Sequence, residues 1–354
     1  MFNYGVAPKS DEVEITVFGP GYGEAIAVHL GDGCWILADS CELPSTKKAA
    51  SLDYLERLGI PFSDVKVIIA THWHDDHVKG LSSMAEACTN ATVYISDVFN
   101  NKEALVFMNA YGGNVASKQT GGTKELYKAI QTPNRHAFAH QQSIIWEGNV
   151  QGRKMRAVAF SPTHAAKAQS IAHFAQYIPS GYDPINHAPE LKPNLEAVVI
   201  NIDLGEDGIL LGSDLEESGE LGWSAIVGDD WCLSNQRASV YKVAHHGSAN
   251  GDHPDIWSKL LLETPAAVLT PFVKGSNNLP NPADKARIVG RTSKAYISSN
   301  GSKKALMNEK LEKRMKQICK NIAVINTAFG AVRFRKKIGE ADWGVELFGQ
   351  AGKL

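Results

Sequence analysis

Four side chains that could bind metal ions stand close together in this chain. The run Thr-His-Trp-His-Asp-Asp-His contributes His72, His74, Asp76 and His77, directly after an apolar run at 65–70. Imidazole nitrogens and carboxylate oxygens are the ligands that hold Zn²⁺ and similar divalent cations. In an extended segment His72 and His74 project to one side, while Asp76 and His77 fall on the following turn. One short loop can therefore supply two adjacent cations.

Two further acidic residues follow apolar runs that are typical of strands. Asp39 ends the second arm of a predicted hairpin, whose first arm is 25–30. Asp214 ends the run 209–214, which follows a predicted strand at 197–202. The Gly-Ser pair before Asp214 lets the backbone bend, so that this carboxylate can approach two cations.

A pair of adjacent histidines completes the set of residues with metal-binding chemistry. His245 and His246 precede Gly247 and Ser248 at the end of another apolar run. With the segments above, this pair resembles the metal-binding signature of the metallo-β-lactamase superfamily, in which such motifs occur in the same order. The resemblance implies an α/β fold of the αββα sandwich type.

The resemblance also assigns roles to these residues. It implies that Asp39 sits behind the ligands and orients them, as outer carboxylates do, and that Asp214 bridges two cations. The family often has Gly-His-Gly where this chain has the histidine pair, and that alignment makes His246 a ligand. His245 is then an extra imidazole that can face a substrate phosphate or donate a proton.

The family's third histidine aligns with His164, in the run Phe-Ser-Pro-Thr-His. His173 and His187 lie in the same irregular region and compete with it for this role. The resemblance implies two divalent cations, zinc or alternatively manganese. Their predicted ligands are His72, His74, Asp76, His77, His164, Asp214 and His246.

Three runs are similar to one branch of the superfamily, the hydrolase domain of the competence protein ComEC and its stand-alone relatives. They lie at 18–26, 212–216 and 245–248. The chain departs from that branch at Glu24, where an aspartate is common, and at Ser213, where the order Gly-Ser-Asp replaces a Thr-Gly-Asp pattern. His164 stands where ComEC-like domains often lack a histidine, which favours a full site for two cations.

This branch is linked to phosphodiester hydrolysis, so the resemblance implies a phosphodiesterase or nuclease that acts on nucleic acid or nucleotides. A hydroxide activated by the two cations would attack phosphorus in line. Asp76 is also expected to position the attacking water, and the candidates for the phosphate side are His245, Ser248 and Lys242.

Two other classes of function stay open. One is hydrolysis of a phosphocholine ester, a thioester or a lactone. The other is a non-catalytic, metal-bound subunit that engages a protein partner through a basic C-terminal face. The intact ligand set argues against this last class, because degenerate family members usually lose ligands.

Composition fits an enzyme with a large core. The chain has 354 residues, 44% of them hydrophobic, and we expect a single domain over 1–354 with its core at about 13–335. The five cysteines are odd in number and widely spaced, which is typical of free thiols in a reducing compartment. We find neither signal-peptide architecture nor an apolar run of membrane-spanning length. The expected location is therefore the cytoplasm, without a membrane partner.

Two long insertions are expected at the rim of the active site, at about 97–150 and 165–193. The sequence also predicts shorter elements. These are a helix capped by Ser45 or Thr46 and ending near Leu58, a helix at 80–87, a helix at 123–131 and an edge strand in the tail after Asp342.

Charge is unevenly distributed along the chain. The net charge of −2 argues against a protein coated in nucleic acid. Yet eleven Lys or Arg residues and only two Glu residues lie between 303 and 337. A predicted amphipathic helix at 308–318, with Leu311, Met315 and Ile318 inward, is either a solvated face or a landing surface for a phosphodiester polymer.

Overall fold

Two large sheets form the centre of the computed structural model, which describes residues 3–19, 23–112, 121–176, 193–274, 277–299, 313–314, 317–318 and 329–354. In the first eight-stranded sheet of this described part, the order is β17 (Gly344–Gly349), β16 (Gly330–Lys337), β1 (Glu12–Gly19), β2 (Ala25–His29), β3 (Trp35–Ala38), β4 (Val65–Ala70), β5 (Thr92–Ser96) and β6 (Arg135–Ala139). The second runs β18 (Gly352–Lys353), β15 (Ala295–Ile297), β12 (Leu261–Leu269), β11 (Ala238–Lys242), β10 (Gly208–Leu211), β9 (Ile200–Asp203), β8 (Arg153–Ala159) and β7 (Ile144–Val150). A small hairpin joins β13 (Phe272–Lys274) and β14 (Asn277–Leu279).

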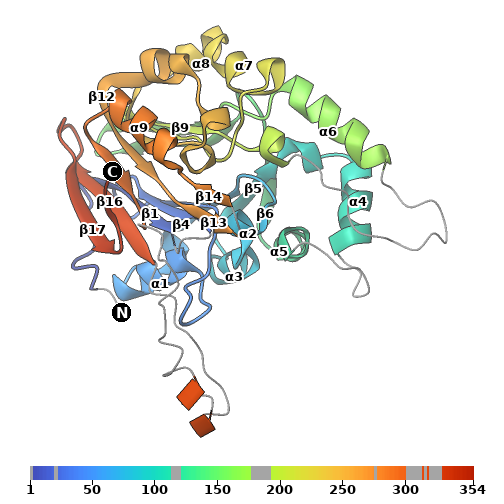
Figure 1. Ribbon diagram of the computed structural model, residues 1–354, viewed down its shortest axis with the longest axis horizontal. Helices are drawn as coiled ribbons and strands as arrows, with labels where there is room; N and C mark the ends of the chain where they lie inside the picture. The colour runs from blue at the N-terminus through green and yellow to red at the C-terminus, as the bar shows by residue number, and fades with distance from the viewer. Residues whose placement is uncertain are drawn as a thin grey trace.

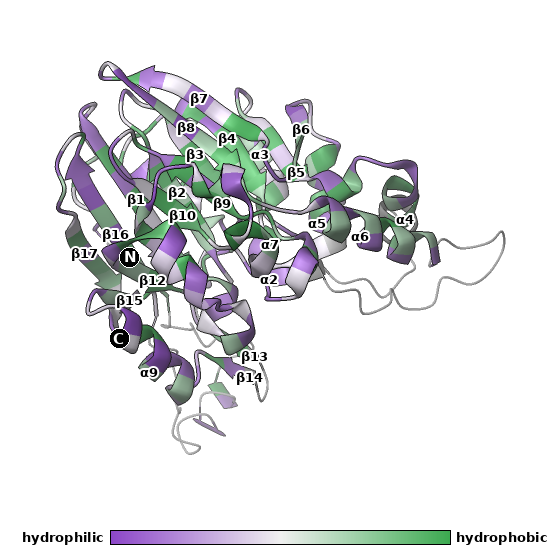
Figure 2. Ribbon diagram, turned by 90° about the horizontal axis from the view of Figure 1, so that it is seen from above, coloured by the Kyte–Doolittle hydropathy of each residue, from purple (hydrophilic) through white to green (hydrophobic). Residues whose placement is uncertain are grey.

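Both faces of the central strands are buried, and apolar residues continue through these strands instead of alternating with polar ones. In β4, Val67 and Ile69 join the core between the two sheets, whereas Ile68 joins the core under the helices of the first sheet. Strand β10 follows the same rule: its Leu210 packs outward and its neighbours pack inward. Figure 2 shows this hydrophobic character through the central strands β3 and β4. The molecule therefore has one core between the sheets and one outside each sheet.

Helices cover the outer faces of the two sheets. Helices α7, α8 and α9 lie over the second sheet, α1 and α3 lie over the first, and α4, α5 and α6 stand together at one side (Figure 1). Their bounds are α1 (Ala50–Arg57), α2 (Asp75–Val78), α3 (Leu81–Ala87), α4 (Lys102–Gly112), α5 (Gly121–Ile130), α6 (His164–Gln176), α7 (Trp223–Val227), α8 (Asp230–Leu233) and α9 (Pro282–Arg291). The layers are helix, sheet, sheet and helix, which confirms the predicted αββα sandwich.

Most local predictions near the ligand loop are confirmed. The hairpin of β2 and β3 forms, and α3 occupies the predicted helix at 80–87. The helix predicted from Ser45 or Thr46 begins later, at Ala50, and has no side-chain cap. The reason is a turn at Lys47, whose φ of 59° is not helical and whose N–H donates to the Leu43 carbonyl.

The first predicted insertion is smaller than the sequence suggests. Helices α4 and α5 stand beside the sandwich, but residues 135–150 supply strands β6 and β7, which belong to the two sheets. These short strands pair with β5 and β8, and their half-exposed sequences lack the long apolar runs that mark the central strands. In the second insertion, α6 extends to Gln176, and 177–192 lie outside the described residues.

At the C-terminus the predicted edge strand is confirmed as β17, which pairs with β16. The basic helix predicted at 308–318 lies mostly outside the described residues, Leu311, Met315 and Lys316 included. Ile318 is described, and it is 84% exposed instead of facing inward. Lys313 and Arg314 are exposed as well. In the part of the chain that the structure describes, no helix has the length and apolar character needed to cross a membrane.

Candidate metal centre

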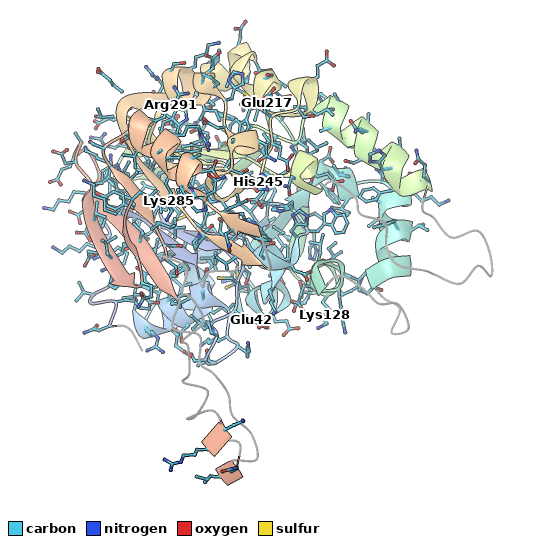
Figure 3. The ribbon with its side chains drawn as sticks, in the orientation of Figure 1. Glu42, Lys128, Glu217, His245, Lys285 and Arg291 are labelled. Atoms are coloured by element: carbon cyan, nitrogen blue, oxygen red, sulfur yellow. The ribbon has the colours of Figure 1, made fainter. Side chains whose placement is uncertain are left out.

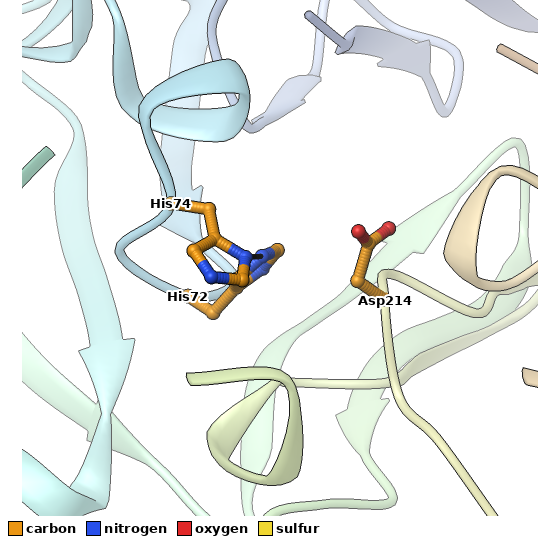
Figure 4. Close-up of side chains that lie close together, drawn as sticks. All are labelled: His72, His74 and Asp214. Atoms are coloured by element: carbon orange, nitrogen blue, oxygen red, sulfur yellow. Dashed lines mark hydrogen bonds between the residues drawn. The ribbon is translucent and has the colours of Figure 1, made fainter. Parts of the chain in front are cut away.

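The predicted residues come together at the ends of two pairs of parallel strands, one pair in each sheet. Asp39 follows β3, and the ligand loop at 71–78 follows β4, which runs parallel to β3 in the first sheet. Asp214 follows β10, and the histidine pair follows β11, which runs parallel to β10 in the second sheet. Parallel strands end at the same edge of a sheet, so each sheet presents its polar residues at one edge. Figure 4 shows His72 and His74 from one edge opposite Asp214 from the other.

Among the described residues, three groups of three side chains could each hold a metal ion. Two of them consist of predicted ligands: the first is His72, His74 and Asp214, and the second is Asp76, His77 and His246. The third, Glu24, Asp39 and His77, shares His77 with the second group. In each group the candidate ligand atoms lie within 4.8 Å of one another. The loop after β4 therefore contributes candidate ligands to two adjacent groups, as its spacing predicts.

Hydrogen bonds behind the first group decide which nitrogen atoms face its centre. The Thr71 hydroxyl donates to Asp39 Oδ2 at 2.8 Å, so it accepts from His72 Nδ1 at 3.1 Å. This leaves His72 Nε2 without a proton, as the acceptor of a 3.1 Å hydrogen bond with His74 Nδ1 (Figure 4). Burial, reinforced by the neighbouring imidazoles of His77 and His74, holds the pKa of His72 well below its usual value. A neutral imidazole with a free nitrogen is the form that binds a cation.

Asp39 lies behind the candidate ligands, where the sequence predicts an orienting carboxylate. Its carboxylate is fully buried and accepts from the Thr71 backbone N–H at 2.8 Å and from His77 Nδ1 at 2.7 Å. The bond to Nδ1 turns His77 Nε2 toward the second group. Burial raises the pKa of Asp39 despite the opposing effect of His77.

Asp214 lies between the two groups. Its Oδ2 is 3.4 Å from His77 Nε2 and 3.3 Å from His246 Nε2, although the residue also belongs to the first group. Burial opposes a charge on His246, but Asp214 and Asp76 outweigh it and raise the pKa of His246 to about 9. In return, His246 and His77 overcome the effect of burial and hold the pKa of Asp214 well below its usual range. The centre therefore favours positive charge next to Asp214.

Unpaired polar atoms show that these residues fit divalent cations. Within the described residues, four ligand atoms are buried without a hydrogen-bond partner: Asp76 Oδ2, His77 Nε2, Asp214 Oδ1 and His246 Nε2. Leaving such an atom unpaired costs about 1–3 kcal/mol, and more for a charged group. Four of them facing one centre are explained by ions that complete their coordination.

The backbone at the centre is strained in the way that functional sites often are. Positive φ angles of 47–55° occur at Asp39, Ser213, His245 and His246, none of which is glycine. Such a conformation costs on the order of 1–3 kcal/mol per residue and persists only where the surroundings enforce it. Each of these residues lies just after a strand, so the bend turns the polar side chains toward the gap between the sheets.

The two adjacent histidines have different surroundings. His246 is buried, and its Nδ1 lies 3.1 Å from both the carbonyl and the hydroxyl oxygen of Thr270. The side chain of His245 is 17% exposed and belongs to neither ligand group of the described chain. Its Nδ1 lies 2.9 Å from the Asn250 amide oxygen, and its Nε2 is 3.3 Å from Asn194 Nδ2. In Figure 3, His245 lies near the middle of the view, inside the ring of exposed side chains.

Two other phosphate-side candidates differ from each other. Ser248 is half-buried, three residues after His245 along the same turn. Lys242 does not face a substrate: its side chain is fully buried and its Nζ lies 2.6 Å from Glu24 Oε2. The prediction for Lys242 is therefore wrong, because the last residue of β11 points into the protein behind the metal ligands.

The structure does not bring His164 to the ligand groups. It is the first residue of α6, is exposed, and its ring lies 6.4 Å from that of His140. His173 lies further along α6, also outside the two groups, and His187 falls outside the described residues. Of the seven predicted ligands, the structure thus gathers six.

The sequence analysis missed three residues that support the ligands: Thr270, Glu196 and the partner of Lys242, Glu24. Thr270 follows β12, so a polar residue at the end of a buried strand could have revealed it. Glu196 accepts from Trp73 Nε1 at 2.9 Å, and Trp73 separates two ligands in the loop. Helix α5 also contacts this loop, since the Gly122 N–H donates to Asp75 Oδ1.

Glu196 gives a prediction about stability and pH. Burial raises its pKa to about 7, against the hydrogen bonds from Ser170 and Trp73. The folded chain therefore binds this proton more tightly than the unfolded chain, and the resulting stability is lost as pH rises through 7. We expect Glu196→Gln to gain about 3 kcal/mol relative to the original chain between pH 4 and pH 8. Urea unfolding of both proteins across this range measures the difference, and parallel pH curves would contradict it.

Part of the chain matches a known family model. Residues 18–164 match the model of the metallo-beta-lactamase superfamily. Among solved structures, the Rm3 metallo-beta-lactamase is 16% identical with a TM-score of 0.36, over 72% of this chain and 82% of the other. The metallo-beta-lactamase SMB-1 bound to 2-mercaptoethanesulfonate is 14% identical with a TM-score of 0.36, over 73% and 85%. A metallo-beta-lactamase mutant from Cronobacter sakazakii is 13% identical with a TM-score of 0.32, over 64% and 74%.

These three likenesses are too low to carry an argument about activity. No curated protein matches the chain. The superfamily match and the two ligand groups support a coarser statement, that the chain is a metal-dependent hydrolase.

Proposed function

We propose that this protein is a phosphodiesterase that uses two divalent cations, zinc or manganese, and acts on nucleic acid or nucleotides. The observation that carries the proposal is the difference in surroundings between His245 and His246. His246 is buried among the candidate ligands, whereas the side chain of His245 lies beside them and is partly exposed. An imidazole that belongs to neither group of predicted ligands, but lies next to them, is suited to a substrate that must release a basic oxygen.

Six residues of the chain would hold the two cations. His72, His74 and Asp214 would hold one cation, and Asp76, His77 and His246 the other, with Asp214 between them. Bound there, two cations would lower the pKa of a shared water toward neutrality and offset the negative charge of a phosphate. Asp76 also has a carboxylate oxygen near His246, at 3.3 Å, so it is placed to orient a water in the centre.

His245 would serve the leaving group. The Asn250 amide oxygen can only accept, so His245 Nδ1 carries a proton and Nε2 is the nitrogen that can take up or hand on another. Glu216 Oε1 lies 3.6 Å from Nδ1 and accepts from Asn194 Nδ2 at 2.8 Å. Asn194, Glu216 and Asn250 therefore hold the ring in one orientation, with Ser248 nearby as a candidate phosphate contact.

Two features of the sequence support phosphodiesters over other esters. The His-His-Gly-Ser run resembles that of the ComEC-like hydrolases, and so do the runs at 18–26 and 212–216. The basic excess at 303–337 suits a polymeric substrate. Of its described members, Lys313, Arg314 and Lys337 are exposed, whereas Arg333 and Lys336 are buried in ion pairs with Glu346 and Asp207. On a polymer, binding would weaken steeply with salt, because each phosphate contact releases counterions.

A substrate panel tests the proposal. Metal-loaded protein is assayed on bis-p-nitrophenyl phosphate, single-stranded DNA, duplex DNA, RNA and cyclic dinucleotides, with a phosphocholine ester, a thioester and a lactone alongside. We expect cleavage of at least one phosphodiester, loss of cleavage after chelation, and recovery when zinc or manganese is added. Cleavage of the phosphocholine ester, the thioester or the lactone, without cleavage of bis-p-nitrophenyl phosphate, DNA, RNA or a cyclic dinucleotide, would overturn the proposal.

A further inference from the structure

A buried ion pair lies directly behind the candidate metal centre. Lys242 Nζ is 2.6 Å from Glu24 Oε2, and both side chains are fully buried. The ammonium also donates to the Ser213 carbonyl at 3.1 Å. It lies only 3.9 Å from Asp214 Oδ1, the residue between the two ligand groups. Lys242 is thus close to two carboxylates and forms its short contact with only one of them.

Glu24 is connected to the rest of the centre. Its Oε2 also accepts from the Thr270 hydroxyl at 2.6 Å, and that hydroxyl then accepts from His246 Nδ1. Its backbone N–H donates to the carbonyl of Asp76 at 2.8 Å. Three residues of the candidate centre, Asp76, Asp214 and His246, therefore lie within one or two contacts of Glu24.

The charges at this place explain why Lys242 needs a partner. Four carboxylates are buried in or beside the centre: Glu24, Asp39, Asp76 and Asp214. Among the ion pairs of the described residues, Lys242 is the one lysine that neighbours any of these four carboxylates. An ammonium paired directly with Asp214 would compete with a metal ion for the same oxygens, because both are cations and attraction rises as the distance falls.

We propose that Glu24 holds the Lys242 ammonium away from Asp214, and that it thereby leaves Asp214 free to bind divalent cations. The difference between 2.6 Å and 3.9 Å is the structural basis of this role. Glu24 is a positioning residue: it acts on the metal ions through Lys242. This inference rests on the proposed function, since it assumes that Asp214 holds cations. Its readout is cation affinity, which does not depend on the substrate.

The role of Glu24 predicts that a second substitution restores the Zn²⁺ affinity that the first one lowers. In Glu24→Gln the ammonium loses its carboxylate partner and is drawn to Asp214, which a movement of the flexible lysine side chain can achieve. We expect the affinity for the more weakly bound Zn²⁺ to fall by roughly tenfold or more. Adding Lys242→Met removes the competing charge, so the double variant should recover affinity to within about threefold of the original chain.

The experiment is a titration of metal-free protein with Zn²⁺ in competition with a chromophoric chelator. It compares the original chain, Glu24→Gln, and the double variant Glu24→Gln with Lys242→Met. A matched control is Asp207→Asn, which removes the carboxylate from another buried lysine pair, with Lys336 at 2.7 Å, at the other end of β10. The control should bind Zn²⁺ as the original chain does.

Recovery in the double variant separates this role from a purely structural one. If Glu24 only supported Thr270 and His246, the double variant would bind as weakly as Glu24→Gln or more weakly, and the proposal would be overturned. Unchanged affinity in Glu24→Gln would overturn it as well. Should Glu24→Gln fail to fold, the double variant, which carries no unpaired charge, should still fold and bind two Zn²⁺ tightly, and weak binding by it would refute the proposal.

The outcomes for the inference and for the proposed function are distinct. A chain that binds two Zn²⁺ and shows the reversal, yet cleaves no phosphodiester, supports the role of Glu24 and contradicts the phosphodiesterase. If the chain cleaves phosphodiesters and all four proteins have the same Zn²⁺ affinity, the phosphodiesterase is supported and the role of Glu24 is contradicted.

Discussion

Asp214→Ala is expected to abolish hydrolysis and to lower the metal content of the purified protein. Asp214 is the one carboxylate that contacts His77 and His246 while also belonging to the group of His72 and His74. Without it, two cations would face each other with no anion between them. We expect a loss of activity of at least about 10³-fold, since both the cations and their geometry are affected.

Elemental analysis of the Asp214→Ala protein, together with an assay of its turnover, measures this prediction. Asp203→Asn is a suitable control, because Asp203 lies at the start of the β9–β10 turn, at the opposite end of β10. The control should retain metal and rate. Near-normal turnover with full metal content in Asp214→Ala would show that Asp214 does not lie between the cations.

Replacing each histidine of the adjacent pair should give two different defects. His246→Ala should lose metal, because His246 Nε2 faces Asp76 and Asp214 at 3.3 Å. His245→Ala should keep both metals and lose rate by roughly 10²–10⁴-fold, the usual effect of removing a general acid or base. The defect of His245→Ala should be smaller on an ester with a good leaving group, such as p-nitrophenolate, which needs no proton.

Metal content and rate are therefore measured for both variants on a natural phosphodiester and on bis-p-nitrophenyl phosphate. Loss of metal in His245→Ala with full metal in His246→Ala would exchange the two roles. An equal rate defect on both substrates would contradict proton transfer by His245 and leave it as a phosphate contact.

The sequence predicts those parts of the site that depend on local patterns. The ligand loop, Asp39 and Asp214 each follow a short apolar run, and the end of a buried strand is a place that periodicity can locate. Because β3 and β4, like β10 and β11, are parallel neighbours, residues at their ends come together. Six of the seven residues predicted as ligands from these patterns and from the family resemblance lie together in the structure.

The remaining features depend on contacts between distant parts of the chain. Thr270 and Glu24 are 246 residues apart, and no local pattern reports that they touch. The same holds for Lys242, which the sequence suggests as a phosphate contact. Only the fold shows that Glu24, the residue before β2, forms a buried ion pair with it. Strands β6 and β7 were assigned to an insertion because their exposed edge positions lack a continuous apolar run.

His164 shows a limit of alignment by motif. The resemblance aligns the family's third histidine with His164 in the run Phe-Ser-Pro-Thr-His, yet this histidine begins α6 and is exposed. The Thr163 hydroxyl accepts from the Ala166 N–H and donates to the Glu220 carbonyl, which fixes the start of that helix. The direction of a side chain at a helix start depends on such contacts more than on the letters around it.

The central claim is that this chain holds two divalent cations, and their stoichiometry tests it most directly. Protein is purified without chelator, supplied with excess zinc or manganese, freed of loose metal and analysed for metal per chain. The two groups of predicted ligands, with Asp214 of the first close to His77 and His246 of the second, predict two equivalents. A clean one-to-one stoichiometry under these metal-replete conditions would contradict the account.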